Sequence, residues 1–327
     1  VVIYCAAVYA IRQVGKFGGR RSRSRLNRSV QKYRKKIMKT KIICTSSGCI
    51  EFAPERYQNL GIDFIRLHVI FEGRDYLEGV DLNNDEFYAK LETLEDPKNN
   101  LPKTSMPSTG DIKAVLDKVV SEGYDEAIVF TLSSKLSGTY ELISNIAKEY
   151  DTVKITVVDT LTNSFSEGYL AIRAQELANE GKTTAEILEE VARIQKTQQF
   201  IAVDGKLDYL IYNGRLKGGK AFFGKMLSIC PIVHFDKEGS LTALESVRTQ
   251  KKALARMCEI IKEKIGDKSP EDYLLWHVYT GKSLLNKLTE IEGNFGIKCN
   301  HEDVIMSSVS GCHNGPWLAG YGLVFLK

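Results

Sequence analysis

The sequence Leu132-Ser133-Ser134-Lys135-Leu136-Ser137-Gly138-Thr139 joins two segments of different pattern. The four apolar residues at 127–130 are typical of a buried strand, and residues 140–147 have the apolar spacing of a helix. The loop therefore connects the carboxyl end of a strand to the amino end of a helix.

This position predicts a site for an anion. Ligands of open α/β sheets bind beyond the carboxyl ends of the strands, and the free N–H groups at the start of a helix favour negative charge there. Three serines and a threonine add hydroxyl groups, while Gly138 lets the backbone approach a ligand closely. We interpret this as an anion site whose binding groups, hydroxyls and backbone N–H groups, carry no fixed positive charge of their own. The alternative is that Ser137 only caps the helix and the other hydroxyls face solvent.

A second hydroxyl-rich segment, Thr104-Ser105-Met106-Pro107-Ser108, precedes another expected helix. Ser108 and Asp111 have the spacing of a capping box, so the helix is expected to begin there. We expect Thr104 and Ser105 to lie in the loop before it. Capping needs only Ser108, which leaves these two hydroxyls available for a ligand.

The order of the expected elements predicts an α/β fold with two α/β domains. In residues 38–163, strands alternate with helices through short connections, which indicates a mostly parallel sheet flanked by helices. We expect its strands at 41–45, 127–130 and 154–159, a short helix at 54–59, a helix from 82 to 94, and two extended segments within 62–76. Residues 164–327 form the second domain. We expect its helices at 169–178, 185–195, 249–265 and 284–291, its strands at 201–204, 229–235, 241–247 and 273–280, and a hairpin turn at 236–239.

The composition excludes several classes of protein. A chain of 327 residues with 43% hydrophobic residues can bury a sizeable core and favours two domains. Its seven cysteines are scattered and form no C-x-x-C pair, which indicates reduced thiols in a cytoplasmic protein rather than a disulfide framework or a zinc site. Residues 38–327 carry 34 basic against 41 acidic side chains, a balance that does not favour nucleic-acid binding.

Residues 1–37 hold eleven Lys and Arg and no acidic residue. Their apolar run precedes the basic residues, the reverse of the order in a signal peptide, and it is too short to span a bilayer. Met38 directly precedes the first expected strand. We therefore expect this basic leader to be non-native or unfolded; the alternative is a basic arm that binds RNA or an anionic lipid surface.

Six short motifs fall in order along residues 38–327. They are Thr104-Ser105-Met106-Pro107-Ser108, Ser133-Ser134-x-x-Ser137-Gly138-Thr139, Val158-Asp159-Thr160, Leu207-x-Tyr209-Leu210 with Gly214-Arg215-Leu216, Val247-Arg248-Thr249, and His313-x-Gly315-Pro316. Each motif is weak by itself. In this order and spacing they resemble the DegV family of bacterial fatty-acid-binding proteins.

The resemblance implies a lipid carrier with an acyl chain in a tunnel between its two domains. In several members of the family, the carrier is one subunit of a fatty-acid kinase. A separate ATP-dependent kinase subunit converts the bound carboxylate to an acyl phosphate for phospholipid synthesis. We therefore expect a cytoplasmic, non-enzymatic protein whose partners are a long-chain fatty acid and that kinase, with no cofactor, metal, nucleic acid or stable membrane insertion.

The resemblance also implies roles for particular residues. The hydroxyl ligands of the carboxylate would be Thr104 and either Ser133 or Ser134. Further residues of the same two motifs would lie beside them: Ser105, Gly138 and Thr139. Residues expected at the head-group end, or where the partner docks, are Arg215, His313 and Arg248.

Three positions depart from the family pattern. Thr45-Ser46-Ser47 stands where the first strand typically ends in T-D-S, so a carboxylate is missing there. Cys230-Pro231 replaces a Lys-Pro pair, and Trp317 replaces a glycine after the H-x-G-P motif. The departures bear on how the partner docks and on the shape of the head-group end, whereas the carboxylate-binding hydroxyls are retained.

Two other functions compete with the carrier. Ser134, His313 and Asp159 could form the triad of a hydrolase acting on a lipid-like substrate, although no G-x-S-x-G sequence is present. A phosphate or nucleotide site is the second alternative, and neither G-x-x-x-x-G-K-[ST] nor G-x-G-x-x-G occurs. The remaining histidines, among them His277, show no metal-ligand spacing.

Overall fold

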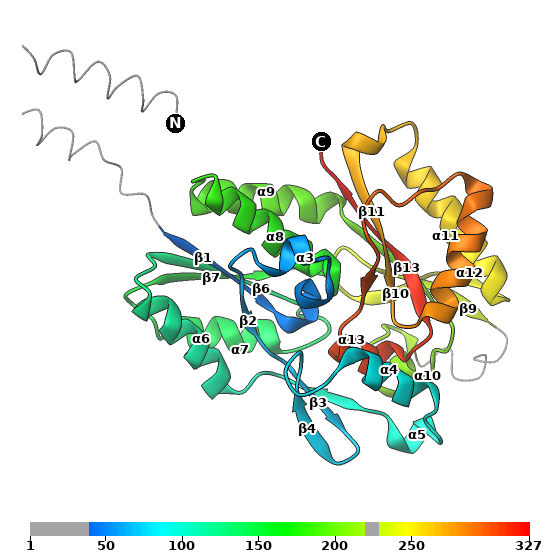
Figure 1. Ribbon diagram of the computed structural model, residues 1–327, viewed down its shortest axis with the longest axis horizontal. Coiled ribbons are helices and arrows are strands. Elements are labelled where there is room, and N and C mark those ends of the chain that lie inside the picture. Colours follow the sequence, from blue (N-terminus) through cyan, green and yellow to red (C-terminus); the bar gives the residue numbers. More distant parts are fainter. Residues whose placement is uncertain (1–38, 220–228) are drawn as a thin grey trace, which may run out of the picture. The chain divides into compact units, whose positions relative to one another are not determined.

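A four-stranded parallel sheet in the order β2-β1-β6-β7 forms one part of the molecule (Figure 1). The computed structural model describes residues 39–219 and 229–327, so the expectations for the basic leader and Cys5 lie outside the described residues. The strands of this sheet are β1 (Thr40–Thr45), β2 (Asp63–Ile65), β6 (Glu126–Thr131) and β7 (Lys154–Asp159). The expected parallel sheet is confirmed.

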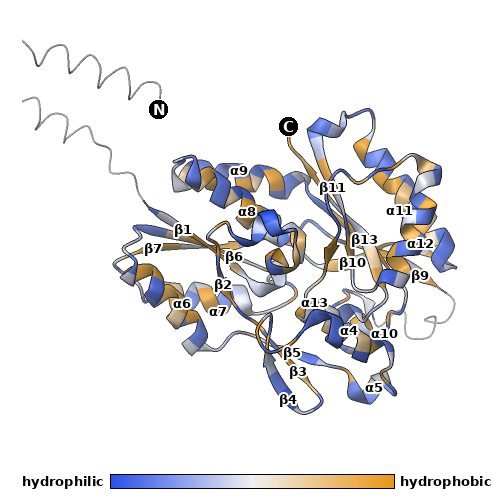
Figure 2. Ribbon diagram, viewed as in Figure 1, coloured by the Kyte–Doolittle hydropathy of each residue, from blue (hydrophilic) through white to orange (hydrophobic). Residues whose placement is uncertain are grey.

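Helices cover both faces of this sheet, which is why its central strands are continuous apolar runs. Helices α6 (Thr109–Ser121) and α7 (Thr139–Ala147) pack on one face, where Ile112 and Ile143 meet Val129 of β6. Helix α8 (Phe165–Asn179) packs on the other face, with α9 (Thr184–Thr197) beside it. In Figure 2 the central strands β1 and β6 are mostly hydrophobic, as burial on both faces requires.

A six-stranded sheet in the order β10-β9-β8-β13-β11-β12 forms the second part. Its strands are β8 (Gln199–Asp204), β9 (Cys230–Phe235), β10 (Leu241–Val247), β11 (Tyr273–Tyr279), β12 (Val304–Ile305) and β13 (Leu318–Phe325). Only β11 and β12 pair in parallel, and β9 and β10 form the expected hairpin. Helices α11 (Gln250–Ile265) and α12 (Lys282–Glu292) cover one face, and Trp276 and Phe165 share the apolar core on the other face with residues of the parallel sheet.

Strand β13 was not predicted from the sequence, although it lies in the interior of its sheet. It contains Gly320 and Gly322, which interrupt the usual strand pattern. A Cβ atom at Gly322 would lie 2.2 Å from the ring of Trp276, so only glycine fits against this indole. Because close packing requires glycine at these positions, β13 lacks the residue pattern by which a strand is predicted.

A small antiparallel sheet in the order β4-β3-β5 carries one of the hydroxyl-rich motifs. Its strands are β3 (His68–Phe71), β4 (Arg74–Leu77) and β5 (Lys103–Ser105), so the prediction of a loop at Thr104 and Ser105 is wrong. Thr104 pairs with Val69, an edge contact that the three-residue strand is too short to reveal in sequence. Residues 62–76 hold three strands rather than two segments, whereas the capping box of Ser108 and Asp111 is confirmed.

Shorter helices complete the described chain. They are α3 (Glu55–Gln58), α4 (Asn84–Glu92), α5 (Pro97–Asn100), α10 (Asp208–Tyr212) and α13 (Ser308–Asn314). No helix within residues 39–219 and 229–327 is long and apolar enough to cross a membrane. The fold is α/β, with the division at residue 163 remaining a prediction because one apolar cluster includes residues of both large sheets.

Candidate functional site

The two hydroxyl-rich motifs line one cavity of about 370 Å³. This volume is in the range of small-molecule sites. Its apolar lining consists of Leu67, Met106, Leu132, Leu136, Phe200, Leu210, Phe235, Leu241, Met306 and Val309. Its other lining residues are Thr104, Ser105, Ser137, Gly138, Asn163, Arg215, Ser310, His313 and Asn314. The lining suits a molecule with an apolar body and an anionic group.

A hydrogen bond between Thr104 and His313 joins two polar residues of the cavity lining. The Oγ1 atom of Thr104 lies 2.9 Å from Nε2 of His313, and Nδ1 of His313 has no hydrogen-bond partner among the described residues. Burial, and then the positive charge of Arg215, lower the pKa of His313 to about 3. The imidazole is therefore neutral at pH 7, and the fixed positive charge in the lining comes from Arg215.

Helix α13 holds His313 at the cavity. The hydroxyl of Ser307 accepts a hydrogen bond from the N–H of Ser310 and caps this helix. The helix ends at Gly315, whose φ of +65° favours glycine. A Cβ atom there would also lie 2.8 Å from the ring of Tyr209. The glycine of the H-x-G-P motif therefore lets the chain turn against Tyr209 directly after His313.

The serine loop after β6 is held by its own hydrogen bonds. The buried hydroxyl of Ser133 donates to the carbonyl of Gly239, 2.7 Å away in the β9–β10 turn, so it joins the loop to the other large sheet. The N-cap of α7 is Gly138, but the hydroxyl of Ser137 accepts from the N–H of Thr139 at 3.3 Å, so Ser137 does contact the start of the helix. The expectation that the other hydroxyls face solvent is wrong for Ser133 and Thr139, which are buried. The hydroxyls of Ser137 and Thr139 lie 2.8 Å apart, and only Ser137 of these two lines the cavity.

The structure therefore brings together some of the expected site residues and not others. Those that line the cavity are Thr104, Ser105, Gly138, Arg215 and His313. Three others, Ser133, Ser134 and Thr139, belong to the same loop but are not among the lining residues. Arg248 is exposed just after β10 and does not line the cavity.

Several polar lining residues were missed by the sequence analysis. Asn163 and Ser310 lie within hydrogen-bond distance, at 3.4 Å, and the amide of Asn314 donates to the carbonyl of Ser310. Ser310 and Asn314 are one turn apart on α13, a helix whose small and polar residues give little apolar periodicity. Recognising that helix would have placed both residues on the same side as the motif histidine.

A buried carboxyl group lies at the end of β1, where the sequence lacks the expected aspartate. It belongs to Glu167 of α8, and the hydroxyls of Thr45 and Ser47 donate to it. The pKa of Glu167 is raised to about 8, chiefly by burial and also by the charge of Glu78. The hydrogen bonds from Thr45 and Ser47 oppose this increase. The hydroxyl of Ser46 instead accepts from the N–H of Leu67.

The other two departures have local structural roles. The thiol of Cys230 is buried and contacts the carbonyl of Asp204 at 3.5 Å. Trp317 packs against Tyr209, with ring centroids 6.1 Å apart, and the ammonium of Lys206 lies 3.6 Å from its ring centroid. Trp317 thus covers the side of Tyr209 beside the H-x-G-P motif.

The hydrolase triad is not assembled by the hydrogen bonds of the described residues. The carboxylate of Asp159 accepts from the backbone N–H groups of Ser134 and Leu161, at 3.2 and 3.0 Å. His313 contacts Thr104 instead. A histidine with a pKa of about 3 is also a weak general base for Thr104.

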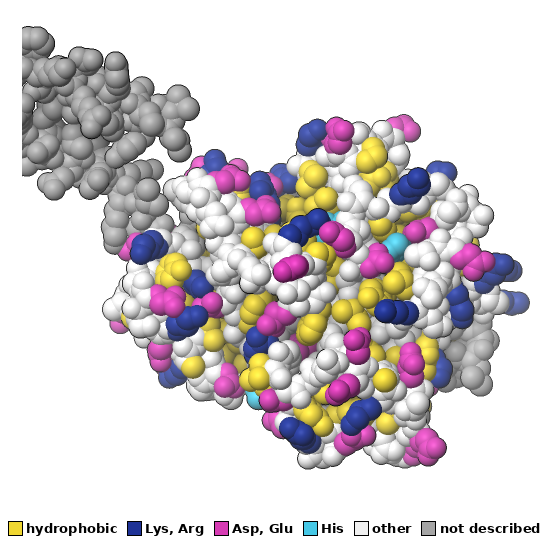
Figure 3. Space-filling view, in the orientation of Figure 1, with side chains coloured by type: hydrophobic (Ala, Val, Ile, Leu, Met, Phe, Trp, Pro, Cys, Tyr) yellow, Lys and Arg dark blue, Asp and Glu magenta, His cyan; other side chains and the backbone are white. Residues whose placement is uncertain are grey.

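The surface charges on the face shown in Figure 3 are mixed. Basic and acidic side chains alternate across it, and hydrophobic side chains gather along its middle. Neither sign of charge forms a continuous patch on this face. Such a distribution gives no electrostatic track for a nucleic-acid backbone there.

Comparison with known proteins reveals close relatives over most of the described chain. A profile of the family described as "Uncharacterised protein, DegV family" matches residues 39–326. A DegV domain-containing protein of Streptococcus pneumoniae is 35% identical over 227 residues, 69% of this chain and 78% of the relative. Another, from Streptococcus pyogenes serotype M6, is 30% identical over 287 residues, 88% of this chain and 99% of the relative.

Solved structures share the fold as well. A fatty-acid-binding DegV family protein from Streptococcus agalactiae superposes with a TM-score of 0.79 and 28% identity, covering 89% of this chain and 100% of the other. A Thermotoga maritima protein, whose structure is described as revealing a fatty-acid-binding function, superposes with a TM-score of 0.72 and 29% identity over 88% of this chain and 100% of the other. Sequence profile, relatives and fold agree, and the chain belongs to the DegV family.

Proposed function

We propose that this protein is a carrier that binds one long-chain fatty acid in the cavity of about 370 Å³. The observation that carries the proposal is the lining itself, in which Thr104, His313 and Arg215 meet among apolar side chains. The fatty-acid binding described for the similar Streptococcus agalactiae and Thermotoga maritima proteins supports it. The same cavity would leave a sugar or nucleotide with unpaired polar groups against apolar walls.

The carboxylate is held at the polar part of the cavity. The hydroxyls of Thr104, Ser105 and Ser137 can donate charge-assisted hydrogen bonds to it, while Arg215 adds a positive charge near His313. Ser133 and Ser134 do not line the cavity; the hydroxyl of Ser133 and the backbone N–H of Ser134 hold the loop through hydrogen bonds to Gly239 and Asp159. The affinity comes mainly from the acyl chain, since burying a sixteen-carbon chain at about 0.8 kcal/mol per methylene gives on the order of 10 kcal/mol before entropic losses.

The bound acid is presented to a separate ATP-dependent kinase in the cytoplasm, which forms the acyl phosphate. The carrier needs no cofactor for this role, because the phosphoryl donor and the catalytic groups belong to the partner. Arg215, at the cavity, and Arg248, just after β10, are exposed cations suited to contact an acidic surface of that partner. The neutral His313 supports a binding role rather than general-base catalysis.

Mass spectrometry of an organic extract tests the ligand class directly. The full chain is purified without detergent, and we expect about one long-chain fatty acid per protein molecule, whose mass reports chain length and unsaturation. An empty extract, together with no thermal shift on adding long-chain acids, would overturn the proposal. Hydrolysis of long-chain esters under the same conditions would favour the hydrolase instead.

Thr104→Val is expected to weaken fatty-acid binding by about 10- to 100-fold. Valine keeps the shape of the side chain but removes a hydrogen bond to a charged group, which contributes about 1.5 to 3 kcal/mol. Fluorescent fatty-acid displacement measures the Kd. Thr289→Val, at an exposed position on α12, is the matched control and is expected to retain the Kd of the unmodified protein. Equal affinities in the two variants would contradict the assignment of Thr104.

Arg215→Ala is expected to reduce acyl phosphate formation more than it reduces binding. Arg215 is exposed, so its guanidinium can meet the partner while the acyl chain stays buried. The measurement compares the Kd for the acid with the rate of phosphorylation by a purified fatty-acid kinase subunit. Lys262→Ala removes an exposed cation from α11 and serves as the control. If the affinity for the acid and the rate of phosphorylation fall to the same extent, Arg215 acts in ligand binding alone and its role in docking the kinase is contradicted.

A further inference from the structure

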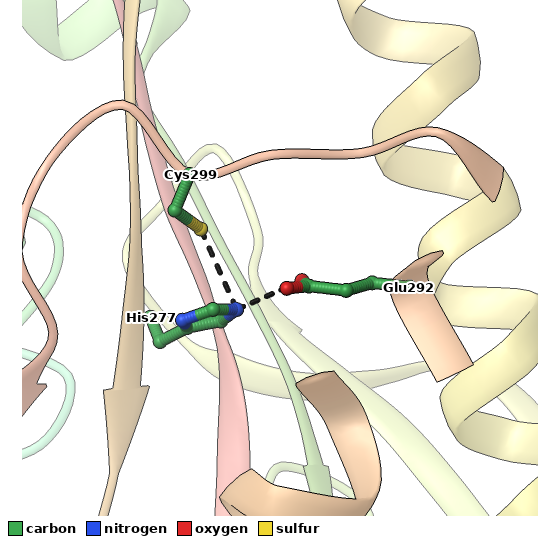
Figure 4. Close-up of side chains that lie close together, drawn as sticks. All are labelled: His277, Glu292 and Cys299. Carbon is green, nitrogen blue, oxygen red and sulfur yellow. Dashed lines mark hydrogen bonds and ion pairs between the residues drawn. The ribbon is translucent and has the colours of Figure 1, made fainter. Parts of the chain in front are cut away.

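A group of metal-ligating side chains lies away from the cavity, on the second sheet. It consists of His277 on β11, Glu292 at the end of α12 and Cys299 in the segment before β12 (Figure 4). The Nε2 atom of His277 lies 2.8 Å from Oε2 of Glu292 and 3.4 Å from Sγ of Cys299. One ligand atom from each of the three residues lies within 4.8 Å of the others.

The two separations from His277 are comparable to those of a tetrahedral zinc site, and the oxygen of Glu292 and the sulfur of Cys299 lie within 4.8 Å of each other. With metal bonds of about 2.0 Å to nitrogen and oxygen and about 2.3 Å to sulfur, a tetrahedron places N and O about 3.3 Å apart and N and S about 3.5 Å apart. The observed N–S distance of 3.4 Å is therefore nearly suitable. The N–O distance of 2.8 Å must widen by about 0.5 Å, a shift that rotation of the long Glu292 side chain can provide.

The surrounding residues supply the contacts that orient metal ligands. The Nδ1 atom of His277 lies 2.7 Å from a carboxylate oxygen of Asp303, which holds the ring with Nε2 directed at Glu292 and Cys299. The hydroxyl of Tyr321 donates to Oε2 of Glu292 at 2.6 Å. A carboxylate behind a ligating histidine and a donor on a ligating carboxylate are the usual outer contacts of zinc sites.

We propose that His277, Glu292 and Cys299 bind one borderline-soft divalent cation of the Zn²⁺ class, with Asp303 and Tyr321 positioning two of the ligands. The mixture of nitrogen, sulfur and oxygen favours Zn²⁺ over Mg²⁺ or Ca²⁺, which prefer oxygen ligands alone. Three protein ligands leave a fourth position for water. Cys299 is only half-buried and the side chain of Asp303 is 45% exposed, so ions and water can reach the site.

The location indicates a structural rather than a ligand-binding role. Along β11, Trp276 and Val278 belong to the core shared with the parallel sheet, and His277 between them points to the opposite face, as strand alternation requires. The metal would therefore join β11, the end of α12 and the segment before the edge strand β12 on the face away from that core. Binding releases two protons to solvent, the thiol proton of Cys299 and the proton shared by Nε2 of His277 and Glu292, because the thiolate and an unprotonated imidazole nitrogen are the ligands.

Metal content and a cobalt spectrum test this site. The full chain is equilibrated with Zn²⁺, dialysed and analysed by mass spectrometry for metal, and a second sample is titrated with Co²⁺. We expect one Zn²⁺ per chain, and a cobalt complex with a thiolate charge-transfer band and the strong visible bands of a tetrahedral site. Chelator competition is expected to give at least a 100-fold weaker affinity in Cys299→Ser and a 10- to 100-fold weaker affinity in Asp303→Asn.

Cys230→Ser is the matched control, because it removes another cysteine that lies outside the group and keeps a donor toward Asp204. It is expected to bind Zn²⁺ as tightly as the unmodified chain. Circular dichroism of each variant separates loss of the metal from loss of the fold. If the unmodified chain retains no zinc, or gives a cobalt spectrum without the thiolate band, the site is a hydrogen-bonded cluster and the proposal is overturned.

Discussion

Replacing Glu167 by glutamine is expected to make the protein more stable than the unmodified chain at pH 8, by up to about 5 kcal/mol. Burial raises the pKa of Glu167 from 4.5 to about 8. Between these two values the unfolded chain has lost the proton while the folded chain keeps it. Stability therefore falls as the pH rises, by about 1.4 kcal/mol per pH unit. Glutamine cannot ionise, and this loss disappears.

Urea unfolding at a series of pH values from 5 to 8 measures the effect. The difference in free energy of unfolding between Glu167→Gln and the unmodified protein is expected to be small at pH 5 and largest at pH 8. Glu141→Gln, which removes a carboxylate at an exposed position on α7, is expected to follow the unmodified profile. Parallel profiles for the unmodified protein and Glu167→Gln would contradict a protonated carboxyl at this site.

Trp276→Ala is expected to lower the free energy of unfolding by about 3 to 5 kcal/mol. The indole is fully buried and packs edge-on against Phe165, with ring centroids 5.3 Å apart. It also lies over Gly322, which has no side chain to fill the resulting space. The lost area and the cavity left between β11 and α8 both destabilise the fold.

Denaturant unfolding at fixed pH, followed by circular dichroism, measures this loss. Trp276→Phe is expected to lose less, because it keeps a ring in the core and removes an indole N–H that has no hydrogen-bond partner within residues 39–219 and 229–327. Trp317→Ala, at the other tryptophan of the chain, is the control at a half-buried position. A loss below 1 kcal/mol in Trp276→Ala would show that the interior closes around the missing ring.

The Glu167 and Trp276 variants both test the packing of helix α8, each at a different contact. Helix α8 carries both Phe165, which contacts Trp276, and Glu167, which contacts the end of β1. It therefore links the parallel sheet to the six-stranded sheet. The cavity takes lining residues from loops of both sheets, so changes in α8 are expected to alter ligand affinity as well as stability.

Sequence patterns predicted the regular elements because their residues obey local rules. Residues 127–130 are apolar because β6 is covered on both faces, and Ser108 caps α6 through bonds within four residues. The motifs placed Thr104 and His313 in one site although 209 residues separate them, and their side chains are hydrogen-bonded. That placement came from the resemblance to a family, since no local pattern connects the two residues.

The same local rules failed where packing required unusual residues. Gly320 and Gly322 make β13 look unlike a strand, because the indole of Trp276 occupies the space of a side chain. Helix α13 is rich in small and polar residues because it lines the cavity and packs closely on α4, so its helical spacing is faint. In both places a tertiary contact determined the residue type.

The sequence alone determined the α/β class, the parallel first sheet and the family, because strand and helix periods and motif order are properties of the chain itself. Only the tertiary structure decided which hydroxyls line the cavity, that a carboxyl from α8 meets the end of β1, and that His277, Glu292 and Cys299 meet. These outcomes depend on distances between segments far apart in sequence. Sheet pairing and helix packing set such distances, and no residue pattern along the chain encodes them.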